Sequence, residues 1–387
     1  MPTRALSVLG VVAVVGLLAG CNGLPGSNSS SSAGQPIKIG LLLEQTGSFS
    51  WYGQENLEGA QLYVDKINSS GGINGRQIEL DTVNNESTPD KSVSGARKLM
   101  QDGVVAILGL GLVGDAQAVS PLVQDSGPPV YSTSGAYLPD NRMMFAGTVY
   151  VADTQKRALQ FLIERKMTNI ALLLTNDASG QVAQQAITQA APGLGIQITR
   201  TELFNPDDVD VTPQMTQIRA SNPQAIVAWV VGKPLGVVLK ASKQLGVDVP
   251  IITSHGNLTP GFIESIADVQ TGPVYMFGTK DLIWRDLPDG DPQKPLVSEM
   301  QNAMQSKYQK EGGIGTGTAY DGLMLLATAL KQANSTDPNK LADALESLRD
   351  VNGVIGTYNL SQQDHRGLDS ASAIPMEIVS GKLQAIK

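Results

Sequence analysis

The feature of this sequence that most constrains its fold is an alternation of short apolar runs with amphipathic stretches. The run at 37–43, IKIGLLL, is continuous and bounded, as expected for a parallel strand buried on both faces. Residues 54–68 follow, with apolar positions from Leu57 to Ile67 spaced as on one face of a helix. Strands and helices of the same kind are expected at 77–84, 90–103, 104–109, 115–127 and 128–135. The alternation predicts an α/β fold, with a parallel sheet covered by helices on both faces.

The same rhythm starts again after about residue 153 and predicts a second unit of similar build. Helices are expected at 154–167, 179–195, 211–222 and 234–246, and strands at 169–177, 196–204, 223–231 and 250–256. Longer helical patterns return between 294 and 350, and two short strands are expected within 373–386. We therefore predict two lobes, one formed by 36–152 plus 282–355 and the other by 153–281 plus 356–387. Parallel sheets bind ligands at the carboxyl ends of their strands, so a cleft between such lobes would enclose a small molecule.

The composition excludes several classes of function. The 387 residues carry a formal net charge of -8 with no cluster of lysine and arginine, so nucleic acid is not expected as a partner. One cysteine and two histidines cannot build a zinc site of the usual kind, and no metal or cofactor is expected. No catalytic triad or pair of carboxylates at a defined spacing can be recognised, which argues against an enzyme.

The first twenty residues are typical of an export signal. Arg4 is the only charge before Cys21, and the run from Ala5 to Gly20 is uncharged and too short for a spanning helix. The segment ends in Leu-Ala-Gly-Cys, which resembles the lipobox of bacterial lipoproteins. That resemblance implies that Cys21 receives a diacylglyceryl group and becomes the first mature residue; a Cys that is merely exported is the alternative. Residues 21–35 are rich in Gly and Ser, as in a flexible tether, and the expected location is lipid-anchored on the outer face of the cell membrane.

The stretch AILGLGLVGDAQ, at 106–117, contains a literal GxGxxG, but the context does not fit a dinucleotide site. The motif follows the third strand, not the first, and no acidic residue ends the next strand. A glycine turn between a strand and a helix still points backbone N–H groups at the cleft, where they would attract a ligand carboxylate. Asp115 capping its own helix is the alternative interpretation, and the two can coexist.

From residue 36 on, the sequence resembles the type I solute-binding proteins of ABC importers, in the leucine/isoleucine/valine-binding group. The opening IGLLLEQTGSFSWYGQENLEGAQLYVDKINSSGGINGRQIEL carries the strongest part of this resemblance, which continues through ILG, VAW and AYDGLMLLATAL. The family implies a two-lobed receptor that closes on a small ligand by a hinge and then docks on a permease, whose ATPase subunits drive import. It implies binding without chemistry, and it leaves the ligand open.

Ten positions of this chain are predicted to contact a ligand: the family pattern implies seven, Trp51 lies beside the family tyrosine, and Asp177 and Trp229 lie at the ends of strands. They are Trp51, Tyr52, Val113, Gly114, Ser134, Ala136, Asp177, Ser179, Trp229 and His255. Several depart from the pattern: the turn serine is Val113, the loop threonine is Ala136, and the aromatic lid of the second lobe is Ser179. At Trp229, packing in the core is an equally supported interpretation.

His255 falls where the family has the acid that pairs with a ligand's ammonium group. A carboxylate facing an ammonium group forms a charge-assisted hydrogen bond, which a neutral imidazole cannot replace. The predicted ligand is an amino acid of the branched-chain type or a related small polar compound. His255 favours an acid, an amide or another amino compound bound in a different way over an ordinary α-amino acid, and Asp177 is the remaining acid for a cationic group. A loop histidine with satisfied hydrogen bonds is the alternative at 255, and a ligand sensor of the same fold is the alternative function.

Overall fold

The computed structural model describes residues 34–368 and 370–386, which belong to one compact unit. Its first sheet has five strands in the order β2-β1-β3-β4-β5, all parallel. These strands are β1 (Ile37–Leu43), β2 (Ile78–Asn84), β3 (Ala106–Gly109), β4 (Val130–Ser132) and β5 (Met144–Ala146). The order places β1 and β3 inside the sheet, and both are apolar along almost their whole length because both faces are covered.

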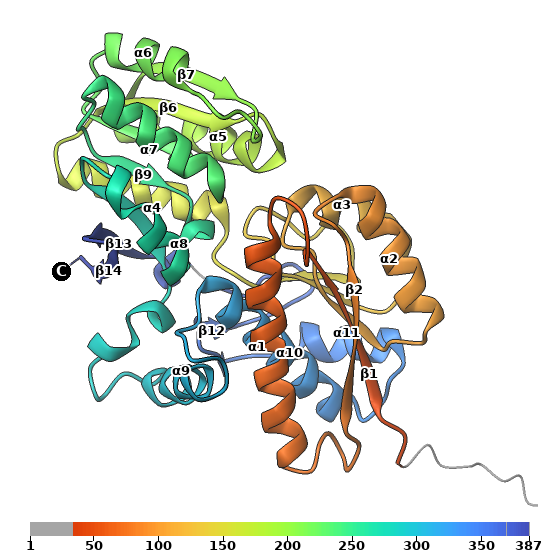
Figure 1. Cartoon of the computed structure of the whole chain (residues 1–387). Helices are drawn as coiled ribbons and strands as arrows, with labels where there is room; N and C mark the ends of the chain where they lie inside the picture. Colours follow the sequence, from red (N-terminus) through yellow and green to blue (C-terminus); the bar gives the residue numbers. More distant parts are fainter. Residues whose placement is uncertain (1–33, 369, 387) are drawn as a thin grey trace, which may run out of the picture. The chain divides into compact units, whose positions relative to one another are not determined.

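Six helices lie in the same parts of the sequence, three before residue 124 and three after residue 293. They are α1 (Ser50–Ser69), α2 (Pro89–Gln101), α3 (Val113–Val123), α9 (Lys294–Tyr308), α10 (Ile314–Ala333) and α11 (Pro338–Glu346). The helices α1 and α10, far apart in the sequence, pack side by side (Figure 1). Gly59 permits this approach, because a Cβ at that position would lie 2.1 Å from the carbonyl oxygen of Thr316.

The second sheet has seven strands in the order β14-β13-β10-β9-β8-β6-β7. Its strands are β6 (Asn169–Thr175), β7 (Gln197–Phe204), β8 (Ala225–Trp229), β9 (Ile251–Thr253), β10 (Val274–Gly278), β13 (Ile374–Val379) and β14 (Lys382–Ala385). The strands β6 to β10 are parallel, whereas β13 and β14 join the sheet antiparallel. Its sequence segment holds the helices α4 (Val151–Glu164), α5 (Ala178–Ala190), α6 (Thr212–Ala220), α7 (Lys233–Leu245) and α8 (Pro260–Ser265). The predicted fold class, α/β with two mainly parallel sheets and their helices, is confirmed.

The chain passes more than once between the segments that form the two sheets. The short pair β11 (Val351–Asn352) and β12 (Thr357–Tyr358) forms a separate small sheet. The His365 ring hydrogen-bonds through Nδ1 to the carbonyl of Met144 in β5 at 2.8 Å, before the chain enters β13. The residue boundaries of the two predicted lobes stay a prediction.

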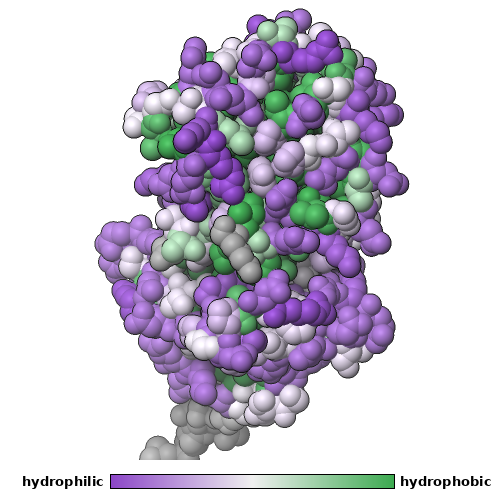
Figure 2. Space-filling view, turned by 90° about the vertical axis from the view of Figure 1, so that its left-hand side faces the viewer, coloured by the Kyte–Doolittle hydropathy of each residue, from purple (hydrophilic) through white to green (hydrophobic). Residues whose placement is uncertain are grey.

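The surface is that of a protein with few exposed apolar side chains. The face in Figure 2 is mostly hydrophilic, and the large hydrophobic side chains described as exposed are Leu138, Leu203, Val209 and Val379. Among residues 34–386, as far as they are described, no helix combines the length and apolar character needed to cross a membrane. The predicted signal, Cys21 and most of the predicted tether lie outside the described residues.

Candidate functional site

A cavity of about 360 Å³ lies where strands of both sheets end. Tyr52, Pro89, Val151 and Ile314 line it from helices, and most of the other lining residues follow eight parallel strands, four from each sheet. From the first sheet these are Ser48, Phe49, Ser87, Gly111 to Asp115 and Thr133 to Ala136; from the second, Asp177 to Ser179, Pro206, Asp207, Val231 and Ser254 to Gly256. The volume and the mixture of apolar walls with a few polar groups are those of a small-molecule site.

The turn between β3 and α3 depends on two residues with positive φ. Gly109 has φ +135°, and buried Leu110 has φ +59°. The next amide, of Gly111, donates to Glu44 Oε1 at 2.8 Å, and Asn85 Nδ2 donates to both Glu44 and Asp115 at 3.1 Å. A buried carboxylate at the end of β1 therefore holds the glycine turn in place.

The start of α3 has no side-chain cap. Its N-cap is Leu112, and Asp115 lies inside the first turn, hydrogen-bonded to Asn85. The interpretation of Asp115 as a cap is therefore wrong, because Asp115 lies inside the helix and its carboxylate accepts a hydrogen bond from the side-chain amide of Asn85. The amides of Asp115 and Ala116 donate to the Leu112 carbonyl, which leaves those of Val113 and Gly114 without an acceptor in the described residues. Val113 and Gly114 line the cavity, so their N–H groups are a candidate anion subsite at a helix N-terminus.

The loop after β4 forms the adjoining wall and is held from behind. The Tyr52 hydroxyl donates to the Thr133 carbonyl at 2.7 Å, so the ring of Tyr52, not its hydroxyl, faces the cavity. The guanidinium of Arg366, only 6% exposed, donates to the carbonyls of Tyr137 and Thr148 at 2.5 Å and of Ser134 at 3.4 Å. A buried positive charge thus lies directly behind Ser134.

His255 faces this loop from the second sheet. A Cβ at Gly135 would lie 2.3 Å from His255 Nε2, so only glycine permits this contact. Burial and the charge of Arg366 lower the pKa of His255 to about 4, and the imidazole is neutral at neutral pH. Within the described residues, His255 Nδ1 and the buried hydroxyl of Thr133 have no hydrogen-bond partner. Such unpartnered buried groups at a cavity are the groups that a ligand would satisfy.

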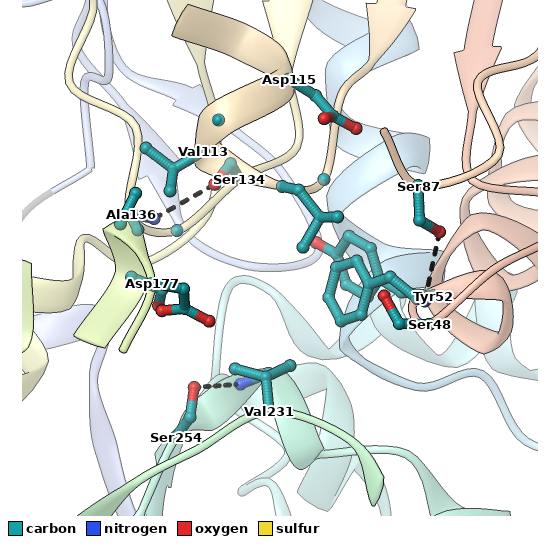
Figure 3. Close-up of a pocket in the computed structure, with 18 of the residues that line it drawn as sticks. Ser48, Tyr52, Ser87, Val113, Asp115, Ser134, Ala136, Asp177, Val231 and Ser254 are labelled. Carbon is teal, nitrogen blue, oxygen red and sulfur yellow. Dashed lines mark hydrogen bonds between the residues drawn. The ribbon is translucent and has the colours of Figure 1, made fainter. Parts of the chain in front are cut away.

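Three aspartates line the cavity, and the described lining contains no lysine or arginine. Asp177 is the N-cap of α5 and accepts from the amide of Gly180 at 2.8 Å, while its carboxylate points into the cavity between Ala136 and Ser254 (Figure 3). Asp115 points away from these residues, and burial together with the charge of Glu44 raises its pKa to about 7. Asp207 lies on an exposed loop.

The structure brings together eight of the ten predicted ligand contacts. Lining the cavity are Tyr52, Val113, Gly114, Ser134, Ala136, Asp177, Ser179 and His255. Trp229 instead lies behind the lining, 1% exposed, and its Nε1 donates to Ser179 Oγ at 3.2 Å. Trp51 also lies behind it, packed edge-on to Phe49 with ring centroids 5.0 Å apart and stacked on Phe262 at 6.4 Å. Direct contact of any of the ten with a ligand stays a prediction.

Sequence reasoning missed several groups of the site. Thr133 and Ser254 are neighbours of residues that were predicted, and each directly follows a strand, which is the signal that could have found them. Glu44 also directly follows a strand, β1, but its role depends on a contact with the distant Gly111. Arg366 gave no such signal, because its contact with Ser134 joins segments that are far apart in the sequence. Among the described residues, no group of three or more His, Cys, Asp or Glu side chains could hold a metal ion.

Comparison with known proteins gives consistent matches. The family model described as periplasmic binding protein matches residues 36–381. A leucine-, isoleucine-, valine-, threonine- and alanine-binding protein of Pseudomonas aeruginosa is 26% identical over 331 residues, covering 84% of this chain and 86% of the relative. An extracellular ligand-binding receptor from Rhodopseudomonas palustris has a TM-score of 0.84 at 20% identity, over 91% of this chain and 99% of that one. A branched-chain amino acid transporter substrate binding protein from Streptococcus pneumoniae, in complex with isoleucine, has a TM-score of 0.79 at 23% identity, over 90% and 98%.

Proposed function

Because this chain belongs to the periplasmic binding protein family, we propose that it is the extracytoplasmic substrate-binding protein of an ABC importer. The resemblance to the type I, branched-chain amino acid group is confirmed by the matching family model and by relatives that bind leucine, isoleucine and valine. The ligand proposed for this chain is an amino acid of that kind or a related small polar compound. It is bound and released unchanged, and the partners are a membrane permease and its ATPase.

The observation that carries this proposal is the meeting of eight strand ends at one cavity. The cavity presents the free amides of Val113 and Gly114 to a carboxylate and the ring of Tyr52 to an apolar body. The buried, unpartnered polar atoms of Thr133 and His255 belong to residues of its wall. These groups recognise a small molecule by hydrogen bonds and apolar contact. A ligand held by both sheets at once would favour closure around it.

A thermal-shift screen of the full-length protein against amino acids, amides and carboxylic acids tests the proposal. A ligand present at a hundred times its dissociation constant stabilises a protein by about 2.7 kcal/mol, which raises the melting temperature by several degrees. We expect at least one compound to do so and the variant Gly111→Ala to lose the response. A Cβ at residue 111 would lie 2.7 Å from the Tyr52 ring and fill that wall of the cavity. A screen in which no compound stabilises the protein would contradict the proposed function.

We also propose that Cys21 carries the lipid that holds this protein at the outer face of the membrane. The support is the sequence alone: an uncharged run ends in Leu18, Ala19, Gly20 and Cys21, and a Gly/Ser-rich stretch follows. Two or more acyl chains on one residue are enough for stable anchoring.

Metabolic labelling with radioactive palmitate tests the anchor. We expect the full-length protein to incorporate label and to sediment with membranes, and the variant Cys21→Ala to incorporate none. Equal labelling of the variant would show that position 21 is not the lipidated residue. Labelling of neither protein would show that the segment is not a lipoprotein signal.

A further inference from the structure

The polar groups around the cavity are arranged to suit a negative charge on one side. The free amides at the start of α3 lie beside the Ser134 loop, as Figure 3 shows for Val113 and Ser134. Arg366 lies directly behind this loop, and its guanidinium donates to the Ser134 carbonyl. A helix N-terminus and a buried guanidinium attract a carboxylate and repel an ammonium group placed near them.

The groups next to this anion subsite are neutral. His255, 4% exposed, contacts the Ser134 loop at Gly135 and carries no charge at neutral pH. Its Nδ1 and the Thr133 hydroxyl are buried and have no partner in the described chain. An imidazole and a hydroxyl can donate or accept a hydrogen bond, and they match a ligand hydroxyl or carbonyl oxygen. An ammonium group brought to this position would lose its water without gaining a carboxylate.

Of the three aspartates in the lining, two do not face the Ser134 loop, and the third, Asp177, uses one oxygen to cap a helix. The Asp115 carboxylate accepts a hydrogen bond from Asn85 and points away from Ser134 (Figure 3). Asp207 lies on an exposed loop, where water screens its charge. Asp177 caps α5 through one oxygen, and its charge is stabilised by that helix. Asp177 is the group that an ammonium could still reach, and the experiment below tests it directly.

Building on the proposed function, we propose that this site selects carboxylic acids whose second polar group is a neutral oxygen. An α-hydroxy or α-oxo acid would place its carboxylate on the amides of Val113 and Gly114 and its neutral oxygen on His255 and Thr133. The corresponding α-amino acid would place an ammonium group against a neutral imidazole with a guanidinium behind it. The site therefore prefers the oxygen-bearing acid over the amino acid of the same carbon skeleton.

Isothermal titration of the full-length protein with matched ligands tests this preference. Two series remove the effect of side-chain shape: leucine with its α-hydroxy and α-oxo analogues, and phenylalanine with its α-hydroxy and α-oxo analogues. We expect an oxygen-bearing acid to bind at least tenfold more tightly than its amino acid, about 1.4 kcal/mol. An amino acid that binds equally or more tightly would overturn the preference and leave the proposed function standing. The absence of binding in both series and in the wider screen would contradict the proposed function itself.

Variants at His255 and Asp177 test which of the two residues faces the second polar group of the ligand. His255→Glu places a carboxylate beside the ligand, so it should shift the ratio of affinities toward the amino acid by at least tenfold. His255→Gln keeps the position neutral, so the ratio should still favour the oxygen-bearing acid even if both ligands bind more weakly. Asp177→Asn keeps the oxygen that caps α5 but removes the charge, and the ratio should stay the same. A tenfold loss of amino acid binding in Asp177→Asn would show that Asp177 holds an ammonium group and would overturn the proposal.

Discussion

Replacing Gly109 by alanine is expected to destabilise the protein by about 3–5 kcal/mol, a large part of the stability of a typical domain. Gly109 has φ +135°, in a region that alanine rarely adopts. A Cβ there would lie 2.0 Å from the carbonyl oxygen of Leu42, its paired neighbour in β1. Backbone in the interior of a sheet cannot move aside without breaking the ladder, so strain and lost hydrogen bonds add together. Urea unfolding followed by circular dichroism measures the loss.

Gly114 provides the matched control, because it belongs to the same GxGxxG motif. It lies in the first turn of α3, its φ is not positive, and a Cβ would meet nothing closer than Pro89 Cγ at 3.9 Å. Alanine is a better helix former than glycine, so Gly114→Ala should change stability by less than about 1 kcal/mol. Equal losses in the two variants would mean that the motif is needed as a unit, and that the close approach of β1 is not what makes Gly109 necessary.

The three glycines of the motif show how far the sequence could be interpreted. Their spacing predicted a tight turn that points amides at a cleft, and the structure places that turn at the cavity. The sequence could not tell that Gly109 is needed for the approach of β1, or that Gly111 makes room for the Tyr52 ring. Both reasons depend on which segment packs against the turn, and spacing along the chain does not contain that information.

The fold was more predictable than the site. Long continuous apolar runs such as β1 and β6, and helices with a clear apolar stripe such as α1, were predicted within a few residues of their observed bounds. The three-residue β5 and the five-residue β10 were missed, because short apolar runs do not distinguish a strand from a buried turn or helix.

The site depends on contacts between segments that are distant in sequence. Arg366 and Ser134 are 232 positions apart, so no local pattern connects the guanidinium with the loop that it supports. Asp115 was assigned to its own helix because the competing partner, Asn85, lies 30 positions earlier. The neutral state of His255 likewise depends on burial and on Arg366, which the fold alone brings together.

The stability of this protein is expected to fall as the pH rises from 5 to 8. Burial raises the pKa of Glu55 to about 8 and those of Asp115, Asp281 and Asp321 to about 7. In the unfolded chain these carboxyls have ordinary pKa values near 4. Between about pH 4 and pH 8 the folded state therefore holds more protons than the unfolded state, and stability decreases with increasing pH. The stabilisation is fully present below about pH 4 and is lost by about pH 8.

Carboxyls with lowered pKa values change the stability only at lower pH, so they do not cancel the decrease in stability between pH 5 and 8. The pKa values of Asp65, Asp102, Asp210, Asp289 and Asp291 are lowered by hydrogen bonds or ion pairs, despite partial burial of some. Their contribution is present above the unfolded pKa near 4 and is lost only as the pH falls further. The lowered pKa of His255, about 4, opposes the effect of the buried carboxyls between about pH 4 and its unfolded value near 6.5, but one histidine is outweighed by several carboxyls. We therefore expect the free energy of unfolding at pH 5 to exceed that at pH 8 by at least about 2 kcal/mol.

Urea unfolding at several pH values between 5 and 8, with two variants, assigns the effect to buried groups. Glu55 accepts from the amide of Gly315 at 3.0 Å, and Glu55→Gln keeps an oxygen for that bond while removing the titrating proton. The variant should have a shallower dependence of stability on pH, because one of the carboxyls with a raised pKa no longer titrates. Glu79→Gln removes an exposed carboxylate from β2 and should leave the slope unchanged. If the wild-type protein were instead more stable at pH 8 than at pH 5, the buried carboxyls would have to be ionised in the folded state. The donors that face these carboxyls, such as the amides of Val354 and Ile355 at Asp321, would then outweigh the cost of burying the charge.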